Sequence, residues 1–281
     1  MLCKIGDIEV WRILEMNVPI LTPEDLWPNA ESDVREAVER HAPGSIDAAT
    51  GGLILPVQGF LLKTSQHIVL VDACVGNHKT NRLPAWHMKS DNRFMSALTA
   101  AGVGPEDIDY VLCTHLHTDH AGWNTQLVDG RWVPTFPNAR YLMPAADNEL
   151  YRELGGAPYV ESVAPVVEAG QAEMVTPGHM LGDHITLIPT PGHTPGHASI
   201  LIRHSGAEAV ITGDALHSTV QCWRPEWELI YDENGKTAVA SRKQLLGDAV
   251  EAGWKVLGSH FKLPSVGRVK AEGDAFRWEE D

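Results

Sequence analysis

Cysteine is scarce in this chain of 281 residues, and its spacing is uninformative for disulfides or zinc ribbons. Four cysteines are present, none in a C-x-x-C pair: Cys3, Cys74, Cys113 and Cys222. Two of them, Cys74 and Cys113, lie within apolar, strand-like runs. We therefore expect buried thiols and a reducing compartment, which argues against a secreted disulfide scaffold.

Hydrophobic runs long enough to cross a membrane are also missing. The longest uncharged apolar stretch, residues 51–62, is too short to span a bilayer and contains Pro56 and Gln58. The first residues include an acidic side chain by position 7 and no long apolar segment, so a secretory signal is not predicted. We expect a cytoplasmic protein with no membrane partner.

Basic residues are outnumbered: 22 Lys and Arg stand against 37 Asp and Glu, a formal net charge of −15. Nucleic acids and anionic membranes require a basic patch, so neither is expected as a partner. No Ser/Gly-rich or single-sign segment separates two halves, which favours one domain over residues 1–281. The polar, proline-containing residues 15–50 are expected to form an N-terminal arm or lid.

Short strand-like runs alternate with a few helical patterns along the chain. Strands are expected at residues 8–14, 53–55, 59–63, 67–72, 110–113, 140–143, 173–175, 184–188, 198–203, 209–212 and 255–257. Helices are expected at residues 32–41 with Ser32 as the N-cap, 91–101, 145–154 and 242–252. Many short strands and few helices indicate an α+β fold, with two stacked sheets covered by helices.

A histidine-rich segment at residues 114–120, Thr-His-Leu-His-Thr-Asp-His, is the strongest chemical signal. In an extended segment His115, His117 and Asp119 start on one side, and a turn then lets Asp119 and His120 face a second point. Imidazole nitrogens and carboxylate oxygens suit zinc, and also iron, manganese or cobalt. The chain has only 14 histidines, so three within six positions predict a metal site rather than a chance surface cluster.

Together with three later motifs, this segment resembles the metallo-β-lactamase superfamily. H-x-H-x-D-H after a short strand is the family signature, and P-G-H-T-P-G-H at 191–197, T-G-D at 212–214 and G-S-H at 258–260 follow in the family's order. Asp72 matches a structural strand-end position of the family. The resemblance covers residues 53–262 and implies an αββα sandwich, in which helices flank two stacked mixed sheets.

The resemblance also implies a dinuclear metal centre with seven ligands. The ligands would come from loops at one sheet edge: His115, His117 and His193 for the first ion, Asp119, His120 and His260 for the second, and Asp214 bridging both. Two Zn²⁺ ions are expected, with Mn²⁺, Fe²⁺ or Co²⁺ as alternatives, because His and Asp donors accept several ions.

The implied chemistry is hydrolysis by a metal-bridging hydroxide, because a metal-held water loses its proton far more easily than bulk water. Asp119 is the expected catalytic carboxylate, which orients the hydroxide or accepts its proton. His217, three residues after Asp214, is the second expected catalytic residue and would hydrogen-bond the substrate or a metal ligand; a supporting or solvated histidine is the alternative. No G-x-S-x-G elbow is visible for a seryl nucleophile.

Residues near these motifs bear on the branch of the superfamily. The lactonase branch tends to carry Tyr where this chain has His217, whereas enzymes of the methyl parathion hydrolase type are similar in their D-x-x-H arrangement. His197 is expected to make a helper hydrogen bond or to have a simple packing role, rather than to bind metal. Trp86, Trp123 and Trp223 are expected to line an apolar substrate pocket, with Trp123 narrowing its entrance; core or dimer packing is the alternative for each.

The resulting expectation is a dinuclear zinc hydrolase that cleaves a small carboxylic ester or lactone and forms the homodimers frequent in the family. Alternatives on the same site are a phosphotriesterase, a β-lactamase and a glyoxalase II-like thioesterase. The missing signal peptide disfavours the β-lactamase, and the lack of a basic cluster for glutathione disfavours the thioesterase. A di-iron redox or binding module is the non-enzyme alternative, disfavoured because no flavodoxin-like segment is present.

Overall fold

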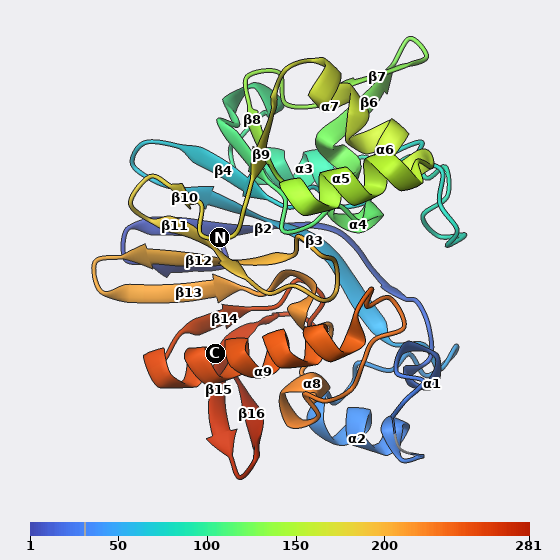
Figure 1. Cartoon of the computed structure of the whole chain (residues 1–281), viewed down its shortest axis with the longest axis vertical. Helices are drawn as coiled ribbons and strands as arrows, with labels where there is room; N and C mark the ends of the chain where they lie inside the picture. The colour runs from blue at the N-terminus through green and yellow to red at the C-terminus, as the bar shows by residue number, and fades with distance from the viewer. Residues whose placement is uncertain (31) are drawn as a thin grey trace. The chain divides into compact units, whose positions relative to one another are not determined.

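Two compact units make up the part of the chain that the structure describes (Figure 1). The computed structural model describes residues 1–30 and 32–281. Unit 1 comprises residues 1–16 and 57–177, and unit 2 comprises residues 17–56 and 178–281. Each unit is built around one seven-stranded sheet. The histidine-rich segment lies in unit 1 and the three later motifs lie in unit 2.

The sheet of unit 1 is mixed and positions the histidine-rich segment. Its strands in spatial order are β1 (Cys3–Ile5), β2 (Ile8–Pro19), β3 (Ile54–Lys63), β4 (Ile68–Val71), β5 (Tyr110–Leu112), β8 (Arg140–Pro144) and β9 (Ala172–Val175). The last four run parallel, with Val71 opposite Leu112. Parallel strands end at the same edge, so Asp72 after β4 meets Thr114 after β5.

Short helices and a separate hairpin complete unit 1. The helices are α3 (Arg93–Ala100), α4 (Thr118–Ala121), α5 (Ala145–Leu154), α6 (Ala157–Ser162) and α7 (Ala164–Glu168), with 3₁₀ turns at Pro105–Asp107 and Gly122–Asn124. The hairpin pairs β6 (Thr125–Val128) with β7 (Arg131–Pro134). Its turn residues Asp129 and Gly130 both have positive φ, as a two-residue hairpin requires.

The sheet of unit 2 also contains two adjacent parallel strands that end at the same edge. Its strands in spatial order are β10 (Met180–Leu181), β11 (Ile185–Pro189), β12 (Ala198–His204), β13 (Ala207–Ile211), β14 (Lys255–Leu257), β15 (Val266–Glu272) and β16 (Ala275–Glu280). Only β13 and β14 run parallel, with Ile211 opposite Leu257. Asp214 and His260 each follow three residues after those partners, so the chain brings them to one edge.

The helices of unit 2 contribute to two clusters of buried apolar side chains. They are α1 (Pro23–Leu26), α2 (Val34–His41), α8 (Val220–Trp223) and α9 (Gly235–Ala252), with a 3₁₀ turn at Gly213–Ala215. Helix α9, the long orange helix of Figure 1, buries Leu245 and Ala249 against Val210 of the sheet. In the second cluster Trp27 and Val38 pack with Val220, so part of the expected arm at residues 15–50 packs against α8.

The α+β class with mixed sheets is confirmed, and every expected strand is present. The two short strands expected at 53–55 and 59–63 are one strand, β3. The expected N-cap Ser32 is wrong: helix α2 starts at Val34, and Asp33 occupies the cap position. Helix α9 begins seven residues earlier than expected, because the Asn234 side chain accepts from the Thr237 N–H and caps it.

Four hairpins were not expected from the sequence. They are β1–β2, β6–β7, β10–β11 and β15–β16, each with a glycine in its turn. Alternating residues around Gly273 carry the signal that would have predicted β15–β16. Among the described residues, no helix is long and apolar enough to cross a membrane, and no disulfide joins the cysteines. Cys74, Cys113 and Cys222 are buried, as expected for the first two.

Candidate metal centre

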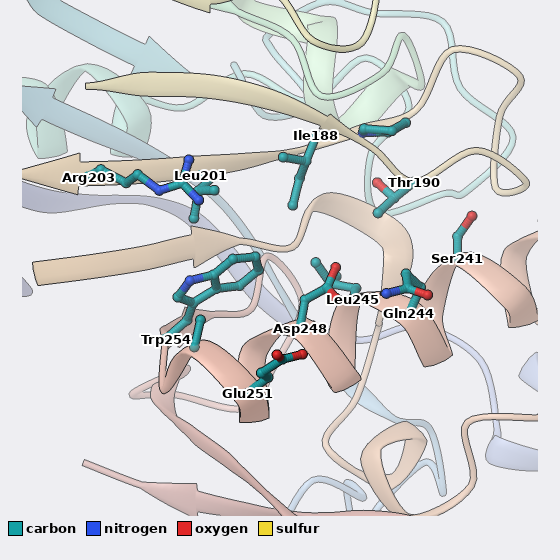
Figure 2. Close-up of a pocket in the computed structure, with 12 residues that line it drawn as sticks. Ile188, Thr190, Leu201, Arg203, Ser241, Gln244, Leu245, Asp248, Glu251 and Trp254 are labelled. Carbon is teal, nitrogen blue, oxygen red and sulfur yellow. Dashed lines mark hydrogen bonds between the residues drawn. The ribbon is translucent and has the colours of Figure 1, made fainter. Parts of the chain in front are cut away.

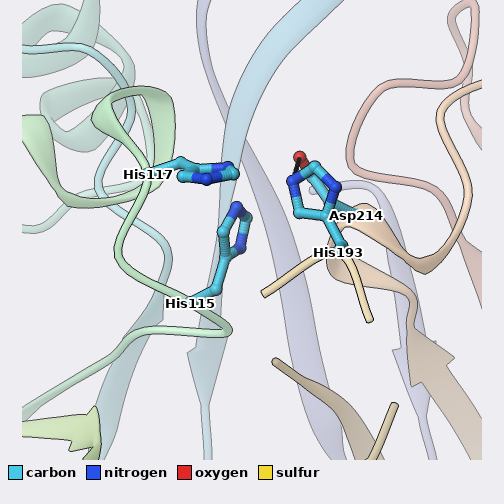
Figure 3. Close-up of side chains that lie close together, drawn as sticks. All are labelled: His115, His117, His193 and Asp214. Carbon is cyan, nitrogen blue, oxygen red and sulfur yellow. Dashed lines mark ion pairs between the residues drawn. The ribbon is translucent and has the colours of Figure 1, made fainter. Parts of the chain in front are cut away.

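The histidine-rich segment of unit 1 gathers three imidazoles. His117 has an extended backbone and occupies the N-cap position of α4, which carries Asp119 and His120 in its first turns. The rings of His115 and His117 meet edge to face at 4.6 Å between centroids, and those of His115 and His120 lie 4.1 Å apart. Figure 3 shows the first of these pairs. The expected turn in this segment is thus the start of a short helix.

Asp72 holds this segment in place. Its carboxylate accepts from the backbone N–H of Thr114 at 2.8 Å and from the Thr114 hydroxyl at 2.9 Å. It also lies 2.8 Å from Nδ1 of His120. A carboxylate only accepts, so Nδ1 of His120 carries the proton, and Nε2 faces Asp119, with 3.8 Å between Nε2 and Oδ2. These contacts agree with the structural strand-end position expected for Asp72, and they orient the ring of His120.

Replacing Asp72 with alanine should lower the free energy of unfolding by about 3 kcal/mol, because buried donors lose their acceptor at ~1–3 kcal/mol each. Asp72 also has φ +60°, which costs alanine about 1 kcal/mol. The exposed Asp129, φ +49°, is a matched control that carries only this backbone cost. Urea unfolding checks both variants; equal losses for Asp72→Ala and Asp129→Ala would contradict the assigned hydrogen bonds.

In unit 2, three imidazoles surround the carboxylate of Asp214. Its Oδ2 lies 3.1 Å from Nε2 of His193 and 3.0 Å from Nε2 of His217. Its Oδ1 lies 3.1 Å from Nε2 of His260. The four side chains are at most 6% exposed. Figure 3 marks the pair of His193 and Asp214 with a dashed line.

The far sides of two of these rings decide which nitrogen faces Asp214. Nδ1 of His260 lies 2.7 Å from the carbonyl of Pro56, and Nδ1 of His193 lies 3.0 Å from the carboxylate of Asp232. Both partners only accept, so both Nδ1 atoms carry a proton. If such a ring is neutral, the lone pair of its Nε2 points toward the negative carboxylate of Asp214. The two repel each other unless a second proton or a cation lies between them.

This donor set fits a metal ion. Metal-bound histidines characteristically donate their other N–H to a carboxylate or a backbone carbonyl. The ligand atoms of Asp214, His217 and His260 also lie within 4.8 Å of one another. Burial lowers the pKa of His193, but Asp214 and Asp232 outweigh it and raise that pKa to about 9. A proton on His193 thus supplies the positive charge that a bound cation would otherwise bring.

His217 differs from its two neighbours around Asp214. Its ring stacks on His260 at 5.3 Å with an interplanar angle of 8°. Burial lowers its pKa, against the opposing effect of Asp214. Its Nδ1 is buried and has no hydrogen-bond partner among the residues that the structure describes. His217 therefore has one ring nitrogen directed at Asp214 and one that no described residue holds.

His197 supports Asp214 from its backbone side. The N–H of Asp214 donates to Nε2 of His197 at 2.8 Å, so Nδ1 carries the ring proton. That nitrogen lies 2.8 Å from the hydroxyl of Thr190 and 3.1 Å from its carbonyl. The helper hydrogen bond expected for His197 is thus present in the structure.

The three tryptophans expected to line a substrate pocket lie in different environments. Trp123 is 5% exposed, stacks on Phe94 and donates its indole N–H to Glu15, so it packs in the interior of unit 1. This packing contradicts a position at a pocket entrance. Trp86 is 6% exposed. Trp223 is partly buried and stacks on the imidazole of His41 at 4.1 Å.

A pocket of about 620 Å³ in unit 2 contains none of the expected site residues (Figure 2). It lies between β11, β12 and α9, with Trp254 and Arg203 at one end and Ser241 at the other. The carboxylates of Asp248 and Glu251 also border it. None of the seven candidate metal ligands lines this pocket, so it is distinct from the cluster around Asp214.

Two charged residues near the candidate ligands had not been singled out from the sequence. Asp232 contacts His193, and Arg242 of α9 lies behind Asp232. Asp232 stands in an irregular segment and Arg242 in an ordinary helix pattern, so neither falls in a motif. No local pattern carries this information, because the contacts join residues 39 and 10 positions apart.

A family model described as the metallo-beta-lactamase superfamily matches residues 54–252, which is more than half of the chain. The chain therefore belongs to the metallo-beta-lactamase superfamily, as the ordered motifs predicted. The metallo-β-lactamase fold, with its mixed sheets and helices, is confirmed by the same match and by solved structures.

Among curated relatives, an N-acyl homoserine lactonase of Bacillus cereus is 32% identical over 186 residues. A second one, from a Bacillus species, is 30% identical over 183 residues. Each match covers 59% of this chain and 66% of the relative. The chain thus spans slightly less than two thirds of the length of these lactonases.

Two solved structures are similar over nearly the whole chain. The hydrolase AbOPH of the beta lactamase superfamily has a TM-score of 0.83 at 24% identity. AidC, a dizinc quorum-quenching lactonase, has a TM-score of 0.82 at 18% identity. Both alignments cover 99% of this chain and 96% of the other. At such identities the likeness establishes the fold.

Proposed function

We propose that this protein is a dinuclear metal hydrolase that cleaves the ester bond of a lactone or a related carboxylic ester. The proposed ligands combine the donors of both units: His115, His117 and His193 for one ion, Asp119, His120 and His260 for the other, and Asp214 shared by both. Zinc is the proposed metal, because imidazole and carboxylate are its usual ligands in open, catalytic sites.

One observation carries the metal-dependent chemistry. The Asp214 carboxylate faces three imidazole nitrogens within 3.1 Å, and two of those rings have their other nitrogen bound to an acceptor. Such an arrangement of lone pairs around a buried carboxylate is stable only with positive charge between them. When bound, the two cations would supply an easily ionised water and polarise the substrate carbonyl.

Two residues of this chain would handle the proton and orient a metal ligand. Asp119 has a side chain that is 14% exposed, which is more open than His120 at 1%. Its carboxylate is therefore the proposed acceptor of the proton that the attacking water loses. His217 is the proposed positioning partner of the metal ligand Asp214, because its Nε2 lies 3.0 Å from Oδ2 of that carboxylate.

The lactone class is inferred from similarity. Relatives named N-acyl homoserine lactonase reach 32% identity over 59% of this chain. A lactone is a cyclic ester, so the same attack on its carbonyl opens the ring without releasing a separate alcohol. The substitution of His217 for the tyrosine typical of that branch makes open-chain aryl esters and phosphotriesters the competing substrates.

A substrate panel tests this proposal. N-acyl homoserine lactones should be hydrolysed with a kcat/KM at least ~10-fold above those of aryl esters, phosphotriesters, thioesters and β-lactams, since ~1.4 kcal/mol of better transition-state binding gives this factor. Proton release in weakly buffered solution follows every class, because each hydrolysis forms an acid, and a thiol reagent gives a second readout for the thioesters. A preference for thioesters or β-lactams would contradict the proposed substrate class. The Asp214→Ala protein, purified identically, controls for contaminating hydrolases.

A further inference from the structure

Arg242, on α9, is a fully buried cation. Its Nε donates to the carbonyl of Ala215 at 2.7 Å, and its Nη1 donates to the carbonyls of Pro225 and Trp227 at 2.9 and 2.7 Å. Burial lowers its pKa, against the opposing effect of Asp232. A buried guanidinium is costly unless it is paired, so this residue must be compensated within unit 2.

Asp232 is the compensating charge, and its side chain is also fully buried. Its Oδ2 lies 3.7 Å from Nη2 of Arg242, an ion pair rather than a hydrogen bond, and accepts from the N–H of Leu229 at 2.9 Å. Its Oδ1 lies 3.0 Å from Nδ1 of His193. A series of contacts between buried side chains therefore connects Arg242, through Asp232 and His193, to Asp214.

The backbone around Asp232 also holds His193. The N–H of Glu233 donates to the carbonyl of His193 at 3.1 Å, and that of Asn234 donates to the carbonyl of Gly192 at 2.8 Å. Gly192 has φ +126°, and a Cβ there would lie 2.1 Å from the backbone nitrogen of Ala238 in α9. The start of α9 and the segment before it therefore fix both the backbone and the ring of His193.

We propose that Asp232 and Arg242 form a positioning pair that sets the orientation and the ligand strength of His193 toward the metal held with Asp214. This inference rests on the proposed function. Asp232 keeps the proton on Nδ1, so Nε2 is the nitrogen available to the metal, and the negative charge increases electron donation by the ring. Arg242 holds the Asp232 carboxylate in place, with 3.7 Å between Nη2 and Oδ2. It also holds the carbonyl of Ala215, the residue that follows Asp214.

Replacing Asp232 with asparagine tests the pair, since it removes the charge and retains the shape. We expect the affinity for one of the two metal ions to fall about 10–100-fold, as it does for orienting partners of metal ligands. Competition with a chromogenic chelator measures the affinity for Zn²⁺ and Co²⁺, and the visible spectrum of the Co²⁺ protein reports changes at its ligands. Asp248→Asn, which changes a partly exposed carboxylate on α9, is the matched control and should leave both readouts unchanged.

The wild-type protein gives a second measurement that no folding defect can obscure. In the zinc-loaded protein, ¹H–¹⁵N spectra of the imidazole rings should show a proton on Nδ1 of His193. A bare Nδ1, or wild-type affinity and an unchanged Co²⁺ spectrum in Asp232→Asn, overturns the pair. A wild-type protein that takes up no metal defeats the proposed function itself. A metal-loaded lactonase that is indifferent to Asp232→Asn defeats this inference alone.

Discussion

Replacing Asp214 with alanine should lower kcat/KM for the best lactone by at least about 10³-fold, equivalent to ~4 kcal/mol of lost transition-state stabilisation. The physical reason is the position of its carboxylate, within 3.1 Å of the Nε2 atoms of His193, His217 and His260. Without it, the first ion would have imidazole ligands alone and no carboxylate to compensate its charge. Metal analysis by mass spectrometry should accordingly find fewer than two ions per chain.

Two further variants make the Asp214 result specific. Asp214→Asn retains the shape of the side chain and removes its charge, so it should lose nearly as much activity as alanine. The exposed Asp183, changed to alanine, controls for the loss of a carboxylate elsewhere in unit 2. Near-normal turnover by Asp214→Ala, with two metal ions still bound, would show that the assigned bridging role is incorrect.

Removal of metal by prolonged dialysis against a chelator should reduce activity about 10³-fold or more, because no side chain of the cluster replaces the activated water. Addition of Zn²⁺, Mn²⁺ or Co²⁺ should restore it. Zinc at ~100 times its dissociation constant should also raise the free energy of unfolding by about 2.7 kcal/mol per ion, if only the folded chain binds it. Urea unfolding with and without zinc measures this shift.

Far-UV circular dichroism of the dialysed protein is the control that the fold persists without metal. Re-addition of Mg²⁺ or Ca²⁺ provides a second control, because these ions prefer oxygen ligands and the cluster is rich in imidazole. Full activity after exhaustive chelation, confirmed by metal analysis, would rule out a metal-dependent hydrolase and would leave the histidine cluster without its proposed role.

In both units, adjacent parallel strands that end at the same edge position the residues of the candidate site. In unit 1 the parallel strands β4 and β5 end together, which places Asp72 beside the histidine-rich segment. In unit 2 the parallel strands β13 and β14 end together, which places Asp214 beside His260. Parallel neighbours deliver their following loops to one edge, so residues tens of positions apart converge without any local sequence signal.

Trp123 illustrates where pattern alone misleads. Its place three residues after His120 favours a pocket wall, yet its ring stacks on Phe94 and its N–H is bound by Glu15. Both partners come from distant elements, so the sequence around Trp123 holds no trace of them. Glu15 itself belongs to the long strand β2, which extends past the end expected from its alternation. Burial of an aromatic ring is therefore decided by what packs against it.

The sequence alone determined the family, the fold class and the candidate ligands, because metal chemistry demands particular donors at short, fixed spacings such as H-x-H-x-D-H. It also identified the strands that carry those donors. The tertiary structure alone decided which nitrogen faces inward in three of the rings, through Asp72, Pro56 and Asp232. It also revealed the buried pair of Asp232 and Arg242. These partners are set by the packing of distant segments, for which no local spacing exists.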